Sequence, residues 1–267
     1  MTANLFVGPC PGGCLYCYAR SMRPNVFHKQ PQFMDPDSID KIKKWPDYLF
    51  LSSYSEPFLP QVLPVTFKLL ERAFAHGTYI SISTKRKPDG KITDLLARNC
   101  DRVSVSISLS SVSHERNGIL EPHVPSAKER PGFADFLTQN QISVWIKADT
   151  LFPSLDDTEE SISSLSREVR LVGVEKIMLS YIFFRPQWKA RLQVPLLEQS
   201  LKEMIENQPI ASGSGFSLPI KEKEVRLREI GRAARSCGFT RIITCGCKNA
   251  INPADIDSRY DSIFPIN

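Results

Sequence analysis

Short β-rich runs alternate with helical patterns along the chain, and this alternation constrains the fold more than any other feature. The runs predict strands over residues 4–7, 47–52, 78–84, 102–109, 142–148, 176–183 and 240–244. The helical patterns between and after them cover residues 62–75, 92–98, 127–140, 157–172, 196–207 and 221–237. Strands joined by helices form parallel sheets. We therefore expect an α/β fold, a partial (β/α)6-type barrel of parallel strands with a C-terminal extension of helix and strand. A doubly wound sheet is the structural alternative.

The composition indicates an ordinary globular protein. Hydrophobic residues make up 42% and charged residues 24% of the 267 positions, which excludes disordered and low-complexity classes. We expect residues 1–190 to form the barrel core and residues 191–267 to pack on it as part of a single structural unit. The net charge of +5 permits an anionic partner without requiring one. Since no run of about 18 apolar residues and no signal peptide is apparent, we expect a cytoplasmic protein that does not bind membranes.

Three of the seven cysteines follow the first predicted strand closely. Cys10, Cys14 and Cys17 have the spacing C-x3-C-x2-C, and the Pro and Gly residues between the first two predict a loop. In a reducing compartment, such thiols more often bind metals or take part in catalysis than form disulfides. Three thiolates leave one position open on a tetrahedral metal or on a four-iron cluster. The alternatives are a zinc site completed by a distant His or Cys, and a set of buried free thiols.

The cysteine spacing, with an aromatic residue before the third cysteine, resembles the radical S-adenosylmethionine (SAM) superfamily. CLYCYAR at residues 14–20, SYSEPFLP at 53–60, STKR at 83–86 and EPHVPSAKER at 121–130 resemble its spore photoproduct lyase-like subgroup. The resemblance implies that Cys10, Cys14 and Cys17 hold a [4Fe–4S] cluster whose fourth iron binds SAM. It further implies that an electron from the cluster cleaves SAM to a 5′-deoxyadenosyl radical, which takes a hydrogen atom from a substrate.

The candidate SAM-binding residues follow the first four predicted strands, at the end where functional groups gather in parallel sheets. They are Tyr16, Ser55, Glu56, Lys85, Ser106, Ser108 and Arg130. The resemblance implies that the loop after the second strand, with Ser53 and Tyr54, receives the SAM amino group, which suits Glu56. Lys85 could pair with the SAM carboxylate, and Ser106 and Ser108 share one face of their strand.

Other strand-end residues are weaker candidates. Arg130 could make a two-pronged contact with a carboxylate, or form a structural pair with Glu121. Lys147 and Asp149 end the fifth predicted strand and could face SAM or substrate. Arg185 follows the sixth strand and is a candidate for substrate contact.

The C-terminal cysteines suggest a second function. Cys245 and Cys247 follow the last predicted strand, so a thiol there could act catalytically by donating a hydrogen atom to a product radical. A second metal site and a structural role are the alternatives. Cys237 precedes that strand by enough residues to lie roughly 20 Å away, so one small cluster cannot bind all three. The hydrogen-donating cysteine of spore photoproduct lyase lies nearer its cluster, and this chain has no cysteine between Cys17 and Cys100.

Together these patterns indicate a radical SAM enzyme. Its substrate would be a nucleobase or nucleic acid, or else a small metabolite or peptide, because fold kinship does not determine substrate. An external electron donor such as flavodoxin or ferredoxin would reduce the cluster. The alternative function is a non-catalytic binding module stabilised by zinc or an iron–sulfur cluster.

Overall fold

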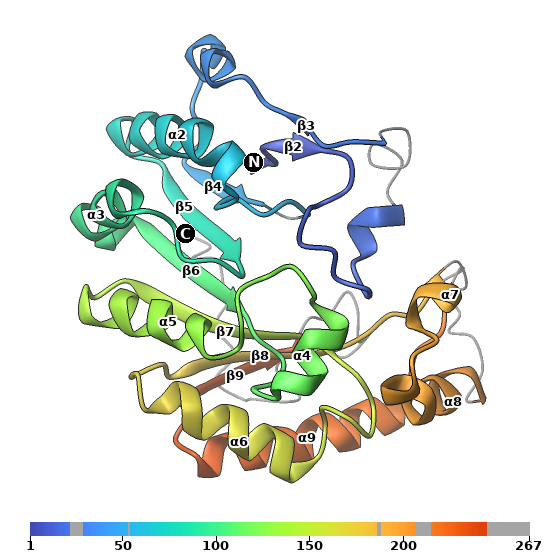
Figure 1. Ribbon diagram of the computed structural model, residues 1–267. Coiled ribbons are helices and arrows are strands. Elements are labelled where there is room, and N and C mark those ends of the chain that lie inside the picture. Colours follow the sequence, from blue (N-terminus) through green and yellow to red (C-terminus); the bar gives the residue numbers. More distant parts are fainter. Residues whose placement is uncertain (22–28, 53, 186–187, 207–214, 245–267) are drawn as a thin grey trace. The chain divides into compact units, whose positions relative to one another are not determined.

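The computed structural model describes residues 1–21, 29–52, 54–185, 188–206 and 215–244 (Figure 1). Its main sheet has seven strands in the order β1-β4-β5-β6-β7-β8-β9. The pairs β1–β4, β4–β5, β5–β6, β7–β8 and β8–β9 are parallel. Except for the pair β1–β4, strands that neighbour each other in the sheet are consecutive strands of this sheet along the chain, and helices connect them. The predicted α/β fold class is therefore confirmed. The strand order does not close on itself among the described residues, as expected for a partial barrel.

The helices and strands have the following bounds. The strands are β1 Thr2–Ala3, β2 Phe6–Val7, β3 Gln32–Phe33, β4 Tyr48–Leu51, β5 Tyr79–Thr84, β6 Val103–Ser108, β7 Ser143–Leu151, β8 Lys176–Tyr181 and β9 Arg241–Thr244. The α-helices are α2 Leu63–Ala75, α3 Gly90–Arg98, α4 His114–Leu120, α5 Glu129–Gln139, α6 Glu159–Arg170, α7 Lys189–Leu192, α8 Glu198–Glu206 and α9 Ile220–Ser236. The 3-10 helices are η1 Tyr18–Ser21, η2 Pro36–Lys41, η3 Pro60–Val62, η4 Cys100–Arg102 and η6 Pro195–Leu197.

The first strand differs from the prediction. The main sheet begins with β1, whose Thr2 pairs with Phe50 of β4. The predicted strand over residues 4–7 is interrupted at Asn4, and only its second half, β2, is extended. It pairs antiparallel with β3 in a separate two-stranded sheet. Two-residue strands show no measurable alternation, so the sequence pattern could not separate these two segments.

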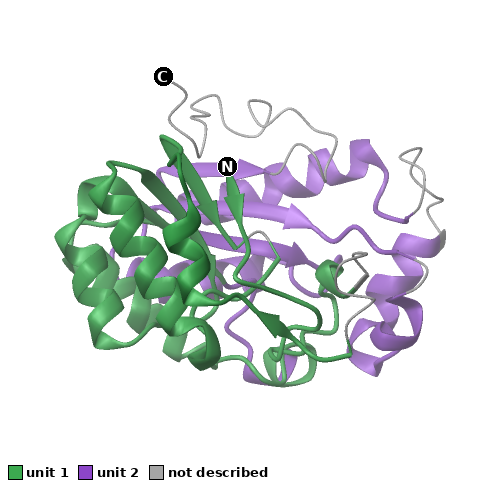
Figure 2. Cartoon of the chain, turned by 90° about the horizontal axis from the view of Figure 1, so that it is seen from above, with its two compact units in different colours: residues 1–108, 117–145 green, residues 109–116, 146–267 purple. Residues whose placement is uncertain are grey.

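The chain divides into two compact units (Figure 2). Unit 1 comprises residues 1–108 and 117–145, and unit 2 comprises residues 109–116 and 146–267. The predicted boundary near residue 190 lies inside unit 2, and the separate extension over residues 191–267 stays a prediction.

Unit 1 contains strands β1, β4, β5 and β6 and the helices that pack on them. Along β6, Val103, Val105 and Ile107 are buried with their side chains on one face, and Ser106 and Ser108 lie on the other. Helix α3 begins at Asp89, whose carboxylate caps the backbone N–H of Ile92. Helices α2, α3 and α5 lie along the same side of these strands (Figures 1 and 2). The opposite face of β6, which carries Ser106 and Ser108, is therefore not the face that these helices cover.

Unit 2 contains a buried ion pair. Arg116 donates to both carboxylate oxygens of Asp156, at 2.9 and 2.7 Å, and both side chains are almost completely buried. Asp156 also accepts the backbone N–H of Phe152 at 3.0 Å. This pair ties the start of α4 to the turn that follows β7. Across the described ranges, no helix is both long enough and apolar enough to cross a membrane.

Candidate functional site

The three clustered cysteines lie on a tight loop directly after β2. Cys10, Cys14 and Cys17 are half-buried, and none of them is in a disulfide. Two turn hydrogen bonds of 3.2 Å hold the loop, from the N–H of Gly13 to the carbonyl of Cys10 and from the N–H of Cys17 to that of Cys14. The Cys14 thiol lies 4.0 Å from the carbonyl oxygen of Gly12. The loop is therefore held by its own backbone, and its sulfurs are available as ligands.

The glycines of this loop allow it to approach the segment after α4. Gly13 has φ +66°, and a Cβ atom there would lie 2.9 Å from the ring of His123. At Gly12, a Cβ atom would lie 3.0 Å from the Val124 side chain. Residues with a side chain rarely adopt the backbone conformation of Gly13. A Cβ atom at either position would force the neighbouring side chain to shift. Gly12 and Gly13 are thus needed for close packing between the cysteine loop and residues 121–125.

We predict that Gly13→Ala lowers the free energy of unfolding by about 1–3 kcal/mol, because it adds left-handed strain and overpacking. Urea denaturation of the full chain measures this loss. Gly132→Ala is the matched control, since Gly132 is exposed in α5 and a Cβ there meets nothing within 4 Å. The control should be neutral or slightly stabilising. Equal stability of the two variants would show that the loop does not have the described conformation.

The loop thiols fit an iron–sulfur or zinc site by their chemistry but are not already arranged around one. Burial raises the pKa of Cys10 to about 11 and that of Cys14 to about 12. Both are therefore protonated at neutral pH, and a metal must displace their protons on binding. Within the ranges that the structure describes, no three His, Cys, Asp or Glu side chains form a ready-made metal site. The donor set is suitable, and the three sulfurs must converge when a metal is loaded.

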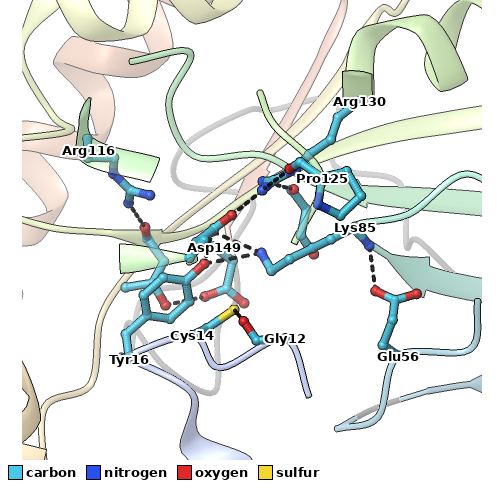
Figure 3. A network of polar contacts seen from close by, with 12 residues as sticks. Gly12, Cys14, Tyr16, Glu56, Lys85, Arg116, Pro125, Arg130 and Asp149 are labelled. Carbon is cyan, nitrogen blue, oxygen red and sulfur yellow. Dashed lines mark hydrogen bonds and ion pairs between the residues drawn. The ribbon is translucent and has the colours of Figure 1, made fainter. Parts of the chain in front are cut away.

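A buried polar network connects the cysteine loop to the strand ends of unit 1. The carboxylate of Glu121 has no exposed surface and accepts hydrogen bonds from Tyr16 Oη, from Arg130 Nη2 and, at 3.2 Å, from Lys85 Nζ. Lys85 Nζ also donates to Tyr16 Oη at 3.1 Å and lies 5.6 Å from its ring centre. Figure 3 shows Tyr16, Lys85 and Arg130 pointing toward one another. The Glu121 carboxylate thus brings together three of the residues predicted to bind the cofactor.

The contacts of Arg130 match the structural alternative. Besides Glu121, its guanidinium donates to the carbonyl of Pro125 at 2.9 and 3.1 Å and to that of Ser108 at 3.0 Å. Its side chain is almost completely buried. Arg130 therefore ties the end of β6 to the segment before α5. A direct contact between Arg130 and SAM stays a prediction.

Glu56 lies at the centre of a second set of contacts. Its carboxylate accepts the backbone N–H of Lys85 at 2.8 Å (Figure 3). It also accepts the backbone N–H of Phe58 at 3.2 Å and the hydroxyl of Thr84 at 2.5 Å. Burial raises the pKa of this carboxyl group. The nearby charge of Arg86 lowers that pKa in part, but among the described residues no Lys or Arg side chain forms a salt bridge with Glu56. A buried carboxylate without a direct salt bridge suits a cationic ligand group, such as an ammonium.

The loop before Glu56 is held by a residue that sequence reasoning missed. Asn4 Oδ1 accepts the backbone N–H of Tyr54 at 3.1 Å and the hydroxyl of Ser55 at 3.3 Å. Ser55 is also 3.2 Å from the hydroxyl of Ser52. An asparagine inside an apolar run was the available signal, because it is a poor strand residue.

The remaining predicted residues are less tightly connected. Ser106 and Ser108 are half-buried on the same face of β6, as predicted. In unit 2, Lys147 Nζ lies 3.7 Å from the Asp149 carboxylate on β7. Arg185 is half-buried beyond β8. Ser53, Cys245 and Cys247 lie outside the described residues, so the catalytic thiol stays a prediction.

Solved structures with a similar fold support the resemblance seen in the sequence. A variant of spore photoproduct lyase matches with a TM-score of 0.65 and 14% identity, over 90% of this chain and 74% of that chain. SuiB from Streptococcus suis matches with a TM-score of 0.62 and 10% identity, over 93% of this chain and 50% of SuiB. The protein shares the fold of spore photoproduct lyase and SuiB. The predicted resemblance to the spore photoproduct lyase-like group is thus confirmed at the level of the fold.

Sequence comparison adds one relative. The "Uncharacterized protein ORF301" of Acidianus two-tailed virus is 26% identical over 194 residues, which are 65% of this chain and 64% of that protein. The match therefore spans less than two thirds of the relative's length. No family model matches the chain.

Proposed function

We propose that the protein is a radical SAM enzyme whose cluster is held by Cys10, Cys14 and Cys17. The observation that carries this proposal is the Glu121 network. It joins Tyr16, between the last two loop cysteines, to Lys85 at the end of β5. This link between the cysteine loop and groups suited to SAM supports the proposal that the thiols and SAM share one site. The fold shared with spore photoproduct lyase and SuiB supports the same function.

The chain's own residues can hold each part of SAM. Glu56, buried without a salt bridge among the described residues, would accept the ammonium group. Lys85 Nζ uses two of its three protons on Tyr16 and Glu121, which leaves one for the SAM carboxylate. Ser106 and Ser108 would offer hydroxyls to the ribose or methionine part, and Ser55 would support the loop beneath. When bound, the [4Fe–4S] cluster supplies one electron that cleaves SAM to methionine and a 5′-deoxyadenosyl radical.

The substrate class remains open between two proposals. One similar structure is spore photoproduct lyase complexed with a dinucleoside spore photoproduct, which supports a nucleobase or nucleic acid. A small metabolite or peptide is the other class, because the fold does not determine the substrate. Under either proposal, a flavodoxin or ferredoxin would deliver the electron, and Cys245 or Cys247 would return a hydrogen atom to the product radical.

Anaerobic reconstitution of the full chain tests this function. We expect about four irons and four sulfides per chain, as in one [4Fe–4S] cluster. Addition of SAM and dithionite should then form 5′-deoxyadenosine, detected by chromatography. About eight irons would instead show a second cluster. Bound zinc, or no metal, with SAM left intact would contradict the enzyme and favour the binding module.

A further inference from the structure

The Glu121 carboxylate brings a negative charge to the cysteine loop within unit 1. Its side chain has no exposed surface. One oxygen accepts hydrogen bonds from Tyr16 Oη and, at 3.2 Å, from Lys85 Nζ, and the other accepts one from Arg130 Nη2. All three partners are donors and two of them are cations, which suits the charged carboxylate.

The segment that carries Glu121 runs beside the cysteine loop. The backbone N–H of Leu15 donates to the carbonyl of Leu120 at 2.9 Å, and the Tyr16 hydroxyl donates to Glu121. These are the two loop residues between the second and third cysteines. The backbone N–H of Glu121 donates in turn to the carbonyl of Asn117 in α4 at 2.8 Å. Two neighbouring contacts thus hold the Glu121 charge close to the thiols.

Lys85 brings a positive charge to the same loop from the end of β5. Its Nζ donates to Tyr16 Oη at 3.1 Å as well as to Glu121, and Figure 3 shows it reaching toward both. Its side chain is only 17% exposed. Charges that are largely buried are screened by salt much less than exposed ones. The charge of Lys85 can therefore act on neighbouring groups with little loss.

These two charges act on a loop thiol in opposite directions. Burial is the largest influence on the pKa of Cys14 and raises it. Among the nearby charges, the cation of Lys85 lowers that pKa by favouring the thiolate, and the carboxylate of Glu121 raises it. Charges shielded from water interact several times more strongly than charges in bulk solvent. The same pair of charges would act on any further negative charge that is added at this loop.

Reduction of a cluster on the loop adds one such charge. A single electron passes to the cluster from dithionite, or from a flavodoxin or ferredoxin, and no bond forms or breaks. The net charge around an iron–sulfur cluster and its exposure to solvent are two determinants of its reduction potential. A fixed anion near the sulfurs opposes the added electron, whereas a fixed cation favours it.

We propose that Glu121 and Lys85 set the reduction potential of the cluster in opposite directions, Glu121 making reduction harder and Lys85 making it easier. Tyr16 donates to Glu121 and accepts from Lys85, and so holds the pair against the loop. Glu121 acts as a positioning residue, through its charge and its hold on Lys85. This role requires a cluster on the three loop cysteines and therefore rests on the proposed function.

A redox titration of the anaerobically reconstituted full chain tests the proposal. Electron paramagnetic resonance follows the reduced cluster, in the absence of SAM. Glu121→Gln removes the anion with little change of shape. It should raise the ratio of reduced to oxidised cluster at a given potential by about tenfold or more, which is a shift of about 59 mV to more positive potential. Lys85→Met removes the cation and should lower that ratio by a similar factor.

The opposite signs separate this role from a merely structural one. A variant that only loosened the site would expose the cluster to water, which would shift the potential in the same direction in both variants. Glu71→Gln and Lys44→Met are the matched controls, because they remove the same charges at exposed positions where solvent screens them. The controls should leave the ratio within about twofold of its original value.

Shifts of the same sign in Glu121→Gln and Lys85→Met, or shifts no larger than those of the controls, would overturn the proposal. If Glu121→Gln does not retain the cluster, Lys85→Met decides alone: a more negative potential supports the proposal, and an unchanged or more positive one overturns it.

The unmodified protein separates this role from the proposed function. If it assembles no [4Fe–4S] cluster, the proposed function fails and the role of Glu121 and Lys85 fails with it. If the cluster assembles and SAM is cleaved, unchanged potentials in both variants would contradict only the role of these two charges and leave the proposed function standing.

Discussion

Cys14→Ala should abolish both iron retention and 5′-deoxyadenosine formation. Cys14 is the middle cysteine of the loop, and it lies in the electrostatic field of Lys85, Glu121 and the other two thiols. Substitution of residues that merely support metal ligands already costs about 10–100-fold in affinity or activity. Loss of a metal ligand itself should cost more, so we expect iron affinity and 5′-deoxyadenosine formation each to fall by more than about 100-fold. Iron analysis and chromatographic assay of the reconstituted variant measure both quantities.

Cys100→Ala provides the matched control for this substitution. Cys100 is also half-buried and free, but it lies in η4 at the start of β6, far along the chain from the loop. Its variant should keep the iron content and activity of the unmodified protein. Unchanged iron in Cys14→Ala would refute the ligand assignment, and equal losses in both variants would indicate general instability.

Arg130→Met should lower the free energy of unfolding by about 3–5 kcal/mol. The substitution keeps an apolar side chain of similar length but removes the guanidinium from the buried Glu121 carboxylate. It also leaves the carbonyls of Ser108 and Pro125 without this donor. Breaking a buried pair on one side is costly because it leaves a charge without compensation. Urea denaturation monitored by circular dichroism measures the loss.

Two further variants identify the cause of that loss. Arg98→Met removes an exposed arginine of α3 and should change stability by no more than about 0.5 kcal/mol. Glu121→Gln combined with Arg130→Met removes the buried charge as well, so the double variant should be less destabilised than the sum of the two single variants. Strict additivity, or a loss below about 1 kcal/mol in Arg130→Met, would show that this pair does not stabilise unit 1.

The sequence predicted the long elements of the fold well, because their patterns extend over several turns or strand positions. β5 and β6 alternate apolar and polar residues, and α2 and α6 bury regular stripes. The shortest elements escaped prediction: β1 and β3 have two residues each. Helix α4 was missed because its seven residues, HERNGIL, contain a glycine and show no repeated apolar face.

The candidate site was predictable in its residues but, apart from the alternative of a pair between Arg130 and Glu121, not in its connections. Strand-end position and resemblance singled out Tyr16, Lys85 and Arg130 separately. Nothing in the sequence pattern showed that Glu121 would join all three, because such contacts form between segments far apart in the chain. The same reason explains why Asn4 was missed. Pairing across long separations is a property of the folded chain, which local patterns do not encode.

The Glu121 network also determines when the cysteine loop can become ordered during synthesis. Its contacts join residues separated along the chain by 105 positions to Tyr16, 36 to Lys85 and 9 to Arg130. Contacts of long sequence separation form late, because closing long loops is entropically costly. On the ribosome, the loop at residues 10–17 therefore waits for about 120 further residues before its partners exist. Metal delivery to this chain should therefore follow folding of unit 1. In shorter nascent chains, the three thiols would lie on a loop that lacks its contacts with Glu121.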